Sequence, residues 1–299
     1  MTDPGALRRA LAERVLLLDG GMGSLLIARG LKGGEAAEGW NLEHPDRVAA
    51  AHRAYVTAGC DVVQTNTFGG NPVKLAASGL DGRCREINAA AVALARRAAG
   101  PDTLVAGDVG PTGVFLPPVG DASEELYRRA FGEQVAALAA AGADLIAIET
   151  MYDLREATAA VEAALATGLP VFASMTFEAR RRGAFTLMGD ALGPSLRALA
   201  AAGADAVGLN CSVGSESMLN LVRAVQAEVD RPLVAQPNAG QPRATADGVV
   251  YDADPETFAR DLAAMVEAGA RVVGGCCGTD PDFIRAARGA LDAGSGAAR

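Results

Sequence analysis

The sequence predicts an α/β protein with a single domain, a closed (β/α)₈ barrel. Three observations predict this fold: a recurring helix–turn–strand signature, eight apolar runs that alternate with helical stretches, and the lack of a visible linker. The 299 residues suit one barrel of ordinary size. We expect a core from about residue 12 to 292, with short flexible termini that complete the domain at 1–299.

The signature reads Ala58-Gly59-Cys60-Asp61 in its first copy and recurs at 141–144, 202–205 and 268–271. Each copy follows an alanine-rich amphipathic stretch and precedes a short apolar run. Because glycine commonly ends a helix in a left-handed turn, each copy predicts a helix, a tight turn and a strand.

The eight apolar runs are typical of parallel strands that are buried on both faces. They comprise residues 15–19, 61–67, 104–109, 144–150, 171–177, 206–211, 233–238 and 272–277. Helices separate them, and Asp254-Pro255 and Asp280-Pro281 each place a side-chain acceptor and a proline at a helix start.

The connections from strand to helix are long and irregular at 110–120, 178–193 and 239–252, whereas those from helix to strand are short. In a (β/α)₈ barrel the strand-to-helix connections lie at the carboxyl ends of the strands, where active sites are built. We therefore expect the functional residues at that end.

The composition excludes several kinds of partner. Lys and Arg number 27 against 36 Asp and Glu, for a net charge of −9, and there are no basic runs to bind nucleic acid or an anionic membrane. The apolar run 15–18 is too short to span a bilayer, and nothing before it resembles a secretory signal, so we expect a cytoplasmic protein. His44 and His52, the two histidines, are expected on one surface helix, which leaves few parts for a Ser-His-Asp or Cys-His mechanism.

Three of the five cysteines follow the ends of predicted strands. Cys211 ends the sixth strand, and Cys276 and Cys277 follow the eighth, which lies next but one to it. Zinc binds thiolates tetrahedrally, and three protein ligands leave one position open. The alternatives are small core cysteines or a disulfide between Cys276 and Cys277. The glycines around the pair and the scarcity of histidine favour zinc.

A zinc ion with three thiolate ligands favours alkylation of a thiol. An incoming thiol is deprotonated on the metal and keeps its nucleophilicity in this electron-rich shell. Zinc sites that activate water for hydrolysis usually contain histidines instead. The predicted reaction is therefore attack of a zinc-bound thiolate on an activated alkyl group, with no separate catalytic side chain.

Two carboxylates and a glycine-rich turn indicate which other groups the substrate carries. Asp19 and Glu149 end the first and fourth strands, where they can hold an ammonium group; the alternatives are an acid/base pair, and a helix cap for Asp19. The turn after Asp19 offers backbone N–H groups to a carboxylate, from Gly20, Gly21, Met22 and Gly23. Thiol, ammonium and carboxylate together describe homocysteine.

Other polar or reactive side chains receive simpler interpretations. Thr67, Asn210 and Asn238 also end strands, and we expect them beside the substrate or behind the metal ligands. Cys60, in a helix-to-strand turn, and Cys84, near a helix start, are interpreted as structural. A barrel lyase that acts through a Schiff base is an alternative, but neither of its candidate lysines, Lys32 and Lys74, ends a strand.

Seven motifs occur in order over nearly the whole chain. They are LLLDGGMGS (16–24), QTNTFGGN (64–71), AGDVGPTG (106–113), DLIAIET (144–150), GLNCSVG (208–214), QPNAGQP (236–242) and GGCCGT (274–279). Together they resemble the homocysteine S-methyltransferase family, which includes betaine–homocysteine methyltransferases and the N-terminal barrel of cobalamin-dependent methionine synthase. The resemblance implies a zinc ion on Cys211, Cys276 and Cys277, with Asp19 and Glu149 at the homocysteine amino group.

The resemblance favours a betaine-type methyl donor, because 33–48 and 110–120 are similar to bacterial betaine-type members. Animal betaine enzymes enclose the quaternary ammonium in aromatic rings by cation–π contacts. Gly69 and Thr150 stand where those enzymes have tyrosines. The aromatic residues that could form a different cage here, or simply pack, are Trp40, Phe68, Phe115 and Tyr152.

Other donors and partners stay open at this point. The chain ends after one barrel, so a separate corrinoid protein is an alternative methyl donor, either to an autonomous enzyme or to a non-catalytic zinc subunit. S-methylmethionine or S-adenosylmethionine is a further alternative. Small molecules are the expected ligands, and further copies of this chain are a partner that the sequence leaves open.

Overall fold

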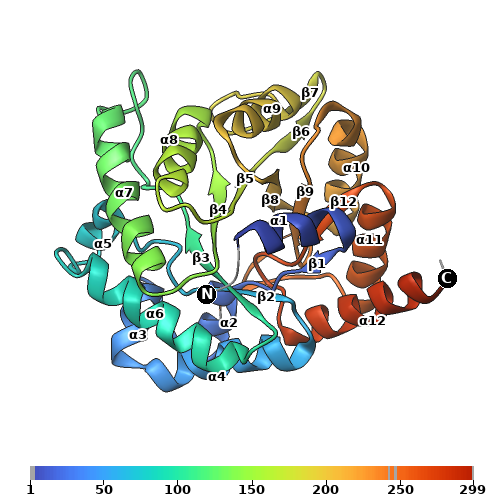
Figure 1. Ribbon diagram of the computed structural model, residues 1–299, viewed down its shortest axis with the longest axis horizontal. Coiled ribbons are helices and arrows are strands. Elements are labelled where there is room, and N and C mark those ends of the chain that lie inside the picture. The colour runs from blue at the N-terminus through green and yellow to red at the C-terminus, as the bar shows by residue number, and fades with distance from the viewer. Residues whose placement is uncertain (1–3, 242, 246–247, 298–299) are drawn as a thin grey trace.

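The computed structural model describes residues 4–241, 243–245 and 248–297. Its main sheet has eight parallel strands in the order β1-β12-β9-β8-β5-β4-β3-β2. They are β1 (Leu16–Leu17), β2 (Val62–Gln64), β3 (Leu104–Val109), β4 (Leu145–Met151), β5 (Val171–Met175), β8 (Ala206–Gly214), β9 (Leu233–Asn238) and β12 (Ala270–Val273). A parallel bridge between Leu18, which follows β1, and Val62 in β2 joins the two ends of this strand order and closes the barrel. The predicted single (β/α)₈, or TIM, barrel is confirmed (Figure 1).

Helices surround this barrel (Figure 1). They are α1 (Pro4–Glu13), α2 (Met22–Ala28), α3 (Trp40–Glu43), α4 (Pro45–Ala58), α5 (Pro72–Ala77), α6 (Cys84–Ala99), α7 (Glu124–Ala140), α8 (Leu154–Leu165), α9 (Leu192–Ala202), α10 (Ser215–Val225), α11 (Pro255–Glu267) and α12 (Pro281–Ala297), with 3₁₀ turns at Ala37–Gly39 and Gln226–Glu228. The signature glycines Gly59 and Gly203 are left-handed C-caps, as predicted. Asp254 caps α11 by accepting hydrogen bonds from two backbone N–H groups.

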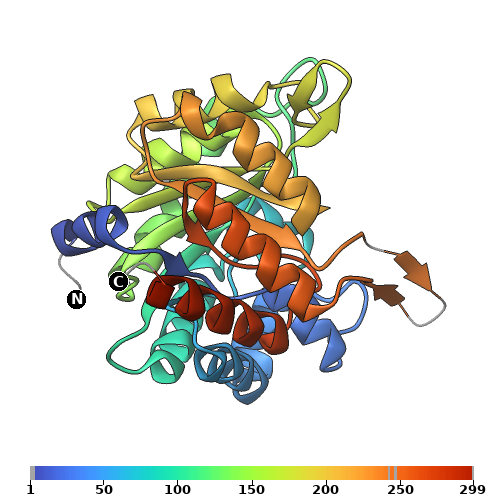
Figure 2. The same ribbon diagram turned by 90° about the vertical axis from the view of Figure 1, so that its right-hand side faces the viewer.

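Helices continue past the expected core at both ends of the described chain. Helix α1 precedes residue 12, and its Leu7 and Leu11 pack with the buried apolar residues of the barrel strands. Helix α12 is still helical at Ala297, five residues past the expected boundary at 292. Apolar periodicity in so short a segment as α1 did not reveal that it covers one end of the barrel (Figures 1 and 2).

The sequence predicts three long, irregular connections, but two of them each contain a β-hairpin. One pairs β6 (Glu178–Arg180) with β7 (Gly183–Phe185), and the other pairs β10 (Arg243–Thr245) with β11 (Gly248–Val250). The second hairpin projects at the end of the barrel opposite α1 (Figure 2). Pro242, the last residue of the QPNAGQP motif, lies outside the described residues. Within the described ranges, no helix is both long enough and apolar enough to cross a membrane.

The last strand is shorter than predicted, and the sixth is longer. β12 ends at Val273, so Cys276 and Cys277 lie on the connection that follows it. There the backbone N–H of Gly275 donates to Asp19 O and that of Cys276 donates to Pro237 O, which ties the connection to both neighbouring strand ends. β8 continues past Cys211 to Gly214.

Candidate metal and substrate site

One cavity opens at the carboxyl ends of the barrel strands, where the long connections predicted it. Its volume is about 330 Å³, which is the size of a small-molecule site. The residues that border it include three cysteines, Cys211, Cys276 and Cys277, and the polar side chains of Gln64, Asp108 and Glu149. Within the part of the chain that the structure describes, no lysine, arginine or histidine borders this cavity.

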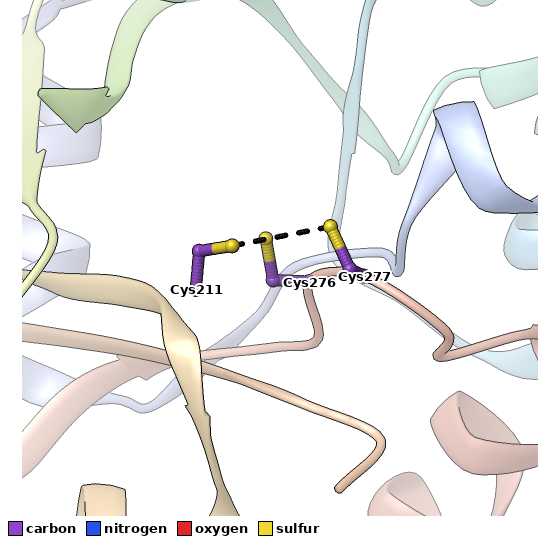
Figure 3. A group of neighbouring side chains, drawn as sticks. All are labelled: Cys211, Cys276 and Cys277. Carbon is purple, nitrogen blue, oxygen red and sulfur yellow. Dashed lines mark hydrogen bonds between the residues drawn. The ribbon is translucent and has the colours of Figure 1, made fainter. Parts of the chain in front are cut away.

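The three cysteines form a compact group (Figure 3). Cys211 lies in β8 and the Cys276–Cys277 pair follows β12, and β9 runs between these two strands, as predicted. The three Sγ atoms all lie within 4.8 Å of one another, and those of Cys211 and Cys277 are 3.9 Å apart. Zn–S bonds of about 2.3 Å in a tetrahedral site separate two sulfurs by about 3.8 Å. All five cysteines are free, so the alternative of a Cys276–Cys277 disulfide is wrong.

Glycines allow the backbone to bring these sulfurs together. A Cβ at Gly275 would lie 2.1 Å from Thr279 Oγ1, and one at Gly21 would lie 2.6 Å from Cys276 O. Only glycine therefore permits the turn after β1 to pack directly against the cysteine loop. Cys211 has a φ of 59°, a left-handed conformation that residues other than glycine rarely adopt. Such strained residues often occur at functional sites.

The three sulfur atoms form a hydrogen-bonded cluster in which one cysteine loses its proton readily and two retain theirs. Hydrogen bonds from the thiols of Cys276 and Cys277 lower the pKa of Cys211 to about 3. The contact with Cys211 raises the pKa of Cys276, and it raises that of Cys277 to about 12. One thiolate is thus stabilised by two thiols, and a divalent cation is what would allow all three to ionise.

Two asparagines hold the cysteines from behind. Asn210 Nδ2 lies 3.8 Å from Cys276 Sγ, and Asn238 Oδ1 accepts a hydrogen bond from Cys277 N at 3.1 Å. Both side chains are buried. Both asparagines thus contact the cysteine pair, the position from which a side chain can orient a metal ligand.

Asp19 and Glu149 are joined through Gln64, which the sequence interpretation missed. Asp19 Oδ2 accepts a hydrogen bond from Gln64 N at 3.0 Å, and Gln64 Nε2 donates to Glu149 Oε2 at 3.1 Å. Asp19 makes no cap for α2, whose N-cap is Gly21 without a side-chain hydrogen bond, so that alternative is wrong. Asp19 is fully buried and lies behind the cavity wall, whereas Glu149 borders the cavity. Burial raises the pKa of Asp19, and it raises that of Glu149 to about 7.

In the glycine-rich turn, not every backbone N–H group is available to a ligand. Gly21 N donates to Thr279 O at 3.0 Å and to Thr279 Oγ1 at 3.1 Å, so it is occupied. All four residues from Gly20 to Gly23 border the cavity, and Met22 and Gly23 begin α2 ahead of its first intrahelical bond. Thr67 also borders the cavity, but its hydroxyl donates to Asp108 O at 2.7 Å.

The four aromatic residues separate into two groups. Phe68 and Tyr152 border the cavity, whereas Trp40 and Phe115 do not. Trp40 is 3% exposed, and its ring packs edge-on against His44 with centroids 4.7 Å apart. A cage of all four rings around one donor is therefore not what the fold builds.

The remaining cysteines and histidines lie away from this site. Cys60 and Cys84 are buried among apolar residues, in accord with structural roles. The expectation that both histidines lie on a surface helix is wrong, because His44 immediately precedes α4 and His52 within it is fully buried. Desolvation lowers the pKa of His52 to about 4.

The fold and the site define a (β/α)₈ barrel with three cysteine sulfurs grouped at the carboxyl ends of its strands, a set that could hold a metal ion. A family model described as homocysteine S-methyltransferase matches residues 16–291. The chain belongs to this family, as the motifs indicated, and it is a methyltransferase.

Similar proteins agree with this assignment. The chain is 37% identical over 296 residues to methionine synthase of Mycobacterium tuberculosis, an alignment that covers 92% of the chain and 24% of that protein. It thus spans about a quarter of the length of the curated relatives it matches. The metallated form of the homocysteine methyltransferase MmuM from Escherichia coli superimposes with a TM-score of 0.79 at 30% identity, over 96% of this chain and 99% of that one. A methyltransferase from Methanosarcina mazei shares the fold at 14% identity, with a TM-score of 0.61 over 97% of this chain and 98% of that one.

Proposed function

We propose that this chain transfers a methyl group to the sulfur of homocysteine to form methionine, with Zn²⁺ held by Cys211, Cys276 and Cys277. The observation that carries this proposal is a group of three sulfurs that borders the same cavity as the carboxylates of Asp108 and Glu149. The names of the relatives, methionine synthase and homocysteine methyltransferase, support the same acceptor. Zinc, when bound, lowers the pKa of the acceptor thiol so that the thiolate is available for transfer.

The protein side chains would then orient the acceptor. Glu149, supported by Asp19 through Gln64, is the proposed partner of the amino group. The first turn of α2, at Met22 and Gly23, is the proposed partner of the carboxylate. In the transfer the sulfur–methyl bond forms as the donor–methyl bond breaks, and the electron pair of the broken bond stays on the demethylated donor. The thiol proton has been released to solvent before this step.

For the donor, we favour a methyl group carried by a corrinoid protein over betaine. The large hydrophobic side chains that stand out as exposed in the described part of the chain are Ile27, Val119, Leu187 and Val250. Three of them, Val119, Leu187 and Val250, lie on strand-to-helix connections, the end at which the cavity opens, and Ile27 lies in α2. We take these three side chains as the apolar rim that a protein partner would contact. Betaine retains only Phe68 and Tyr152 as cation–π partners at the cavity.

A donor panel tests this proposal. The purified zinc-loaded chain is assayed with homocysteine and each of betaine, S-methylmethionine, S-adenosylmethionine, free methylcobalamin and a methyl-corrinoid protein, and zinc is measured on the same sample. We expect about one zinc per chain and methionine from the corrinoid donors. Methionine from betaine alone would overturn the corrinoid assignment, and a chain without zinc or methionine in any arm would overturn the proposed function.

The exposed rim provides a control for a protein-borne donor. Leu187 is 72% exposed, so Leu187→Ser removes apolar surface without disturbing the core. The rate with the corrinoid protein should fall, while the rate with free methylcobalamin should stay at the wild-type value. Equal rates with the corrinoid protein for both chains would argue against docking on this rim.

A further inference from the structure

Asp108 is a buried carboxylate at the cavity, and the proposed reaction gives it no role. It lies in β3, borders the cavity, and is 6% exposed. Its Oδ1 atom is buried and has no hydrogen-bond partner in the described structure. A buried carboxylate oxygen without a partner is costly, because its desolvation is not compensated. An oxygen of this kind at a cavity therefore points to a donor on a ligand.

The surroundings of Asp108 specify the charge of that ligand. Burial raises the pKa of Asp108, and the negative charges of Glu149 and Asp19 raise it further. Asp19 Oδ1 is likewise buried without a partner in the described residues. Because the described residues that border the cavity include no cationic side chain, the three carboxylates can ionise together only when the ligand brings a positive charge.

A primary ammonium group matches this arrangement. It carries one positive charge and three N–H donors, so it can satisfy three acceptors at once. Glu38, the other carboxylate at the cavity, already accepts a hydrogen bond from Gly69 N at 2.6 Å. In the closed barrel β3 lies across from the strands that carry the cysteines. A small amino acid thiol can therefore extend from Asp108 to the sulfurs through the one cavity.

We propose that Asp108 is a substrate-binding residue that forms, with Glu149, a socket for the ammonium group of the acceptor, and that Asp19 supports this socket from behind through Gln64. The socket makes a free amino group a requirement, and thiols without one are rejected because the buried carboxylates would remain uncompensated. This assignment rests on the proposed function, since it takes homocysteine as the acceptor.

The experiment is a binding cycle that pairs one substitution with one change in the ligand. Isothermal titration calorimetry measures the binding of homocysteine and of 4-mercaptobutanoate, its analogue without the amino group, to zinc-loaded wild type and Asp108→Asn. The substitution retains the shape of the side chain. The backbone at this position is held independently, because Asp108 N donates to Thr65 Oγ1 at 3.0 Å and Asp108 O accepts from Thr67 Oγ1 at 2.7 Å.

We expect Asp108→Asn to raise the Kd of homocysteine about 10- to 100-fold, the effect of losing one hydrogen bond between charged groups. The Kd of 4-mercaptobutanoate should change less than about twofold. Asp121→Asn, an exposed carboxylate on the connection that follows β3, is the matched control for the loss of one charge and should bind both ligands as wild type does.

Three outcomes would overturn the assignment. Equal weakening of both ligands would make Asp108 structural, and unchanged binding of homocysteine with a raised KM for the methyl donor would place it at the donor. Unchanged binding and unchanged kinetics would remove it from the site. Asp108→Ser repeats the cycle if the asparagine variant fails to fold, and zinc content and urea unfolding are measured for every variant. A wild type that binds zinc but not homocysteine would instead contradict the proposed function.

Discussion

Asn210 and Thr150 form a reciprocal pair of hydrogen bonds between β8 and β4. Thr150 N donates to Asn210 Oδ1 at 2.8 Å, and Asn210 Nδ2 donates to Thr150 Oγ1 at 2.7 Å. Thr150 has a φ of 58°, which a β-branched residue adopts only when its surroundings impose it. Because Thr150 follows Glu149 and Asn210 precedes Cys211, this pair couples the position of a carboxylate to that of a proposed metal ligand.

Asn210→Ala should weaken zinc binding about 10- to 100-fold, the usual effect of losing a residue that orients a metal ligand. Competition with a chromophoric chelator measures the zinc affinity. Asn220→Ala, on the exposed face of α10, provides the control and should bind zinc as wild type does. Equal zinc affinities for Asn210→Ala and wild type would contradict the role of the pair.

Cys276→Ala should lose both zinc and activity while the barrel stays folded, because the two remaining sulfurs cannot hold the metal in a closed set. Metal analysis, circular dichroism and the methyl-transfer assay are made on one sample. Cys60→Ala removes an equally buried sulfur at a helix-to-strand turn and should retain zinc at a cost of about 1 kcal/mol in stability. Full zinc content in Cys276→Ala would show that the metal site is elsewhere.

Gly275→Ala should reduce both stability and zinc content, because its Cβ would lie 2.1 Å from Thr279 Oγ1 in a tightly packed turn. Overpacking of this kind typically costs about 1–3 kcal/mol, measured here by urea unfolding. Gly132→Ala in α7 meets nothing within 4 Å and should be neutral or stabilising by up to about 1 kcal/mol. A neutral Gly275→Ala variant would mean that the cysteine loop tolerates displacement.

The pKa of Glu149 predicts a specific dependence of stability on pH. Burial raises this pKa from 4.5 to about 7, so the folded state binds the proton more tightly than the unfolded state does. The contribution of Glu149 to the free energy of unfolding is therefore fully present below about pH 4.5 and is lost as the pH rises to about 7. The free energies of unfolding of wild type and Glu149→Gln are measured by urea unfolding in the presence of a chelator. Wild type should lose stability relative to Glu149→Gln as the pH rises across this interval. A difference that is constant with pH would refute the raised pKa.

The separation of the aromatic residues predicts two different phenotypes. Tyr152→Ala should change the KM for the methyl donor, because Tyr152 borders the cavity. Trp40→Ala should lower stability by about 3–5 kcal/mol, since the ring is buried against His44 and Arg47. The milder Trp40→Phe should leave the donor KM unchanged. A donor KM that shifts in Trp40→Phe and not in Tyr152→Ala would reverse these assignments.

The sequence alone was sufficient for the barrel and for the grouping of the three cysteines. Buried parallel strands leave continuous apolar runs, and glycine turns mark where each helix returns to the sheet, so local pattern is enough to count eight units. Because the carboxyl ends of barrel strands converge, Cys211, Cys276 and Cys277 could be brought together from their strand positions. The burial of Leu7 and Leu11 at one end of the barrel could not be predicted, because the sequence of α1 has no pattern that marks it as part of the barrel.

Only the tertiary structure decided what each polar or aromatic residue near the mouth contacts. Trp40 and Tyr152 look alike as candidates in the sequence, yet one is in the core and the other at the cavity. Asn210 faces Thr150, Asp19 lies behind Gln64, and Asp108 is left with an oxygen that has no partner. These differences depend on side-chain direction and on hydrogen bonds between residues 40 to 60 positions apart, such as the 45 that separate Asp19 from Gln64 and the 60 that separate Thr150 from Asn210. Periodicity and spacing carry no record of such pairings, because they arise only when the strands close into a barrel.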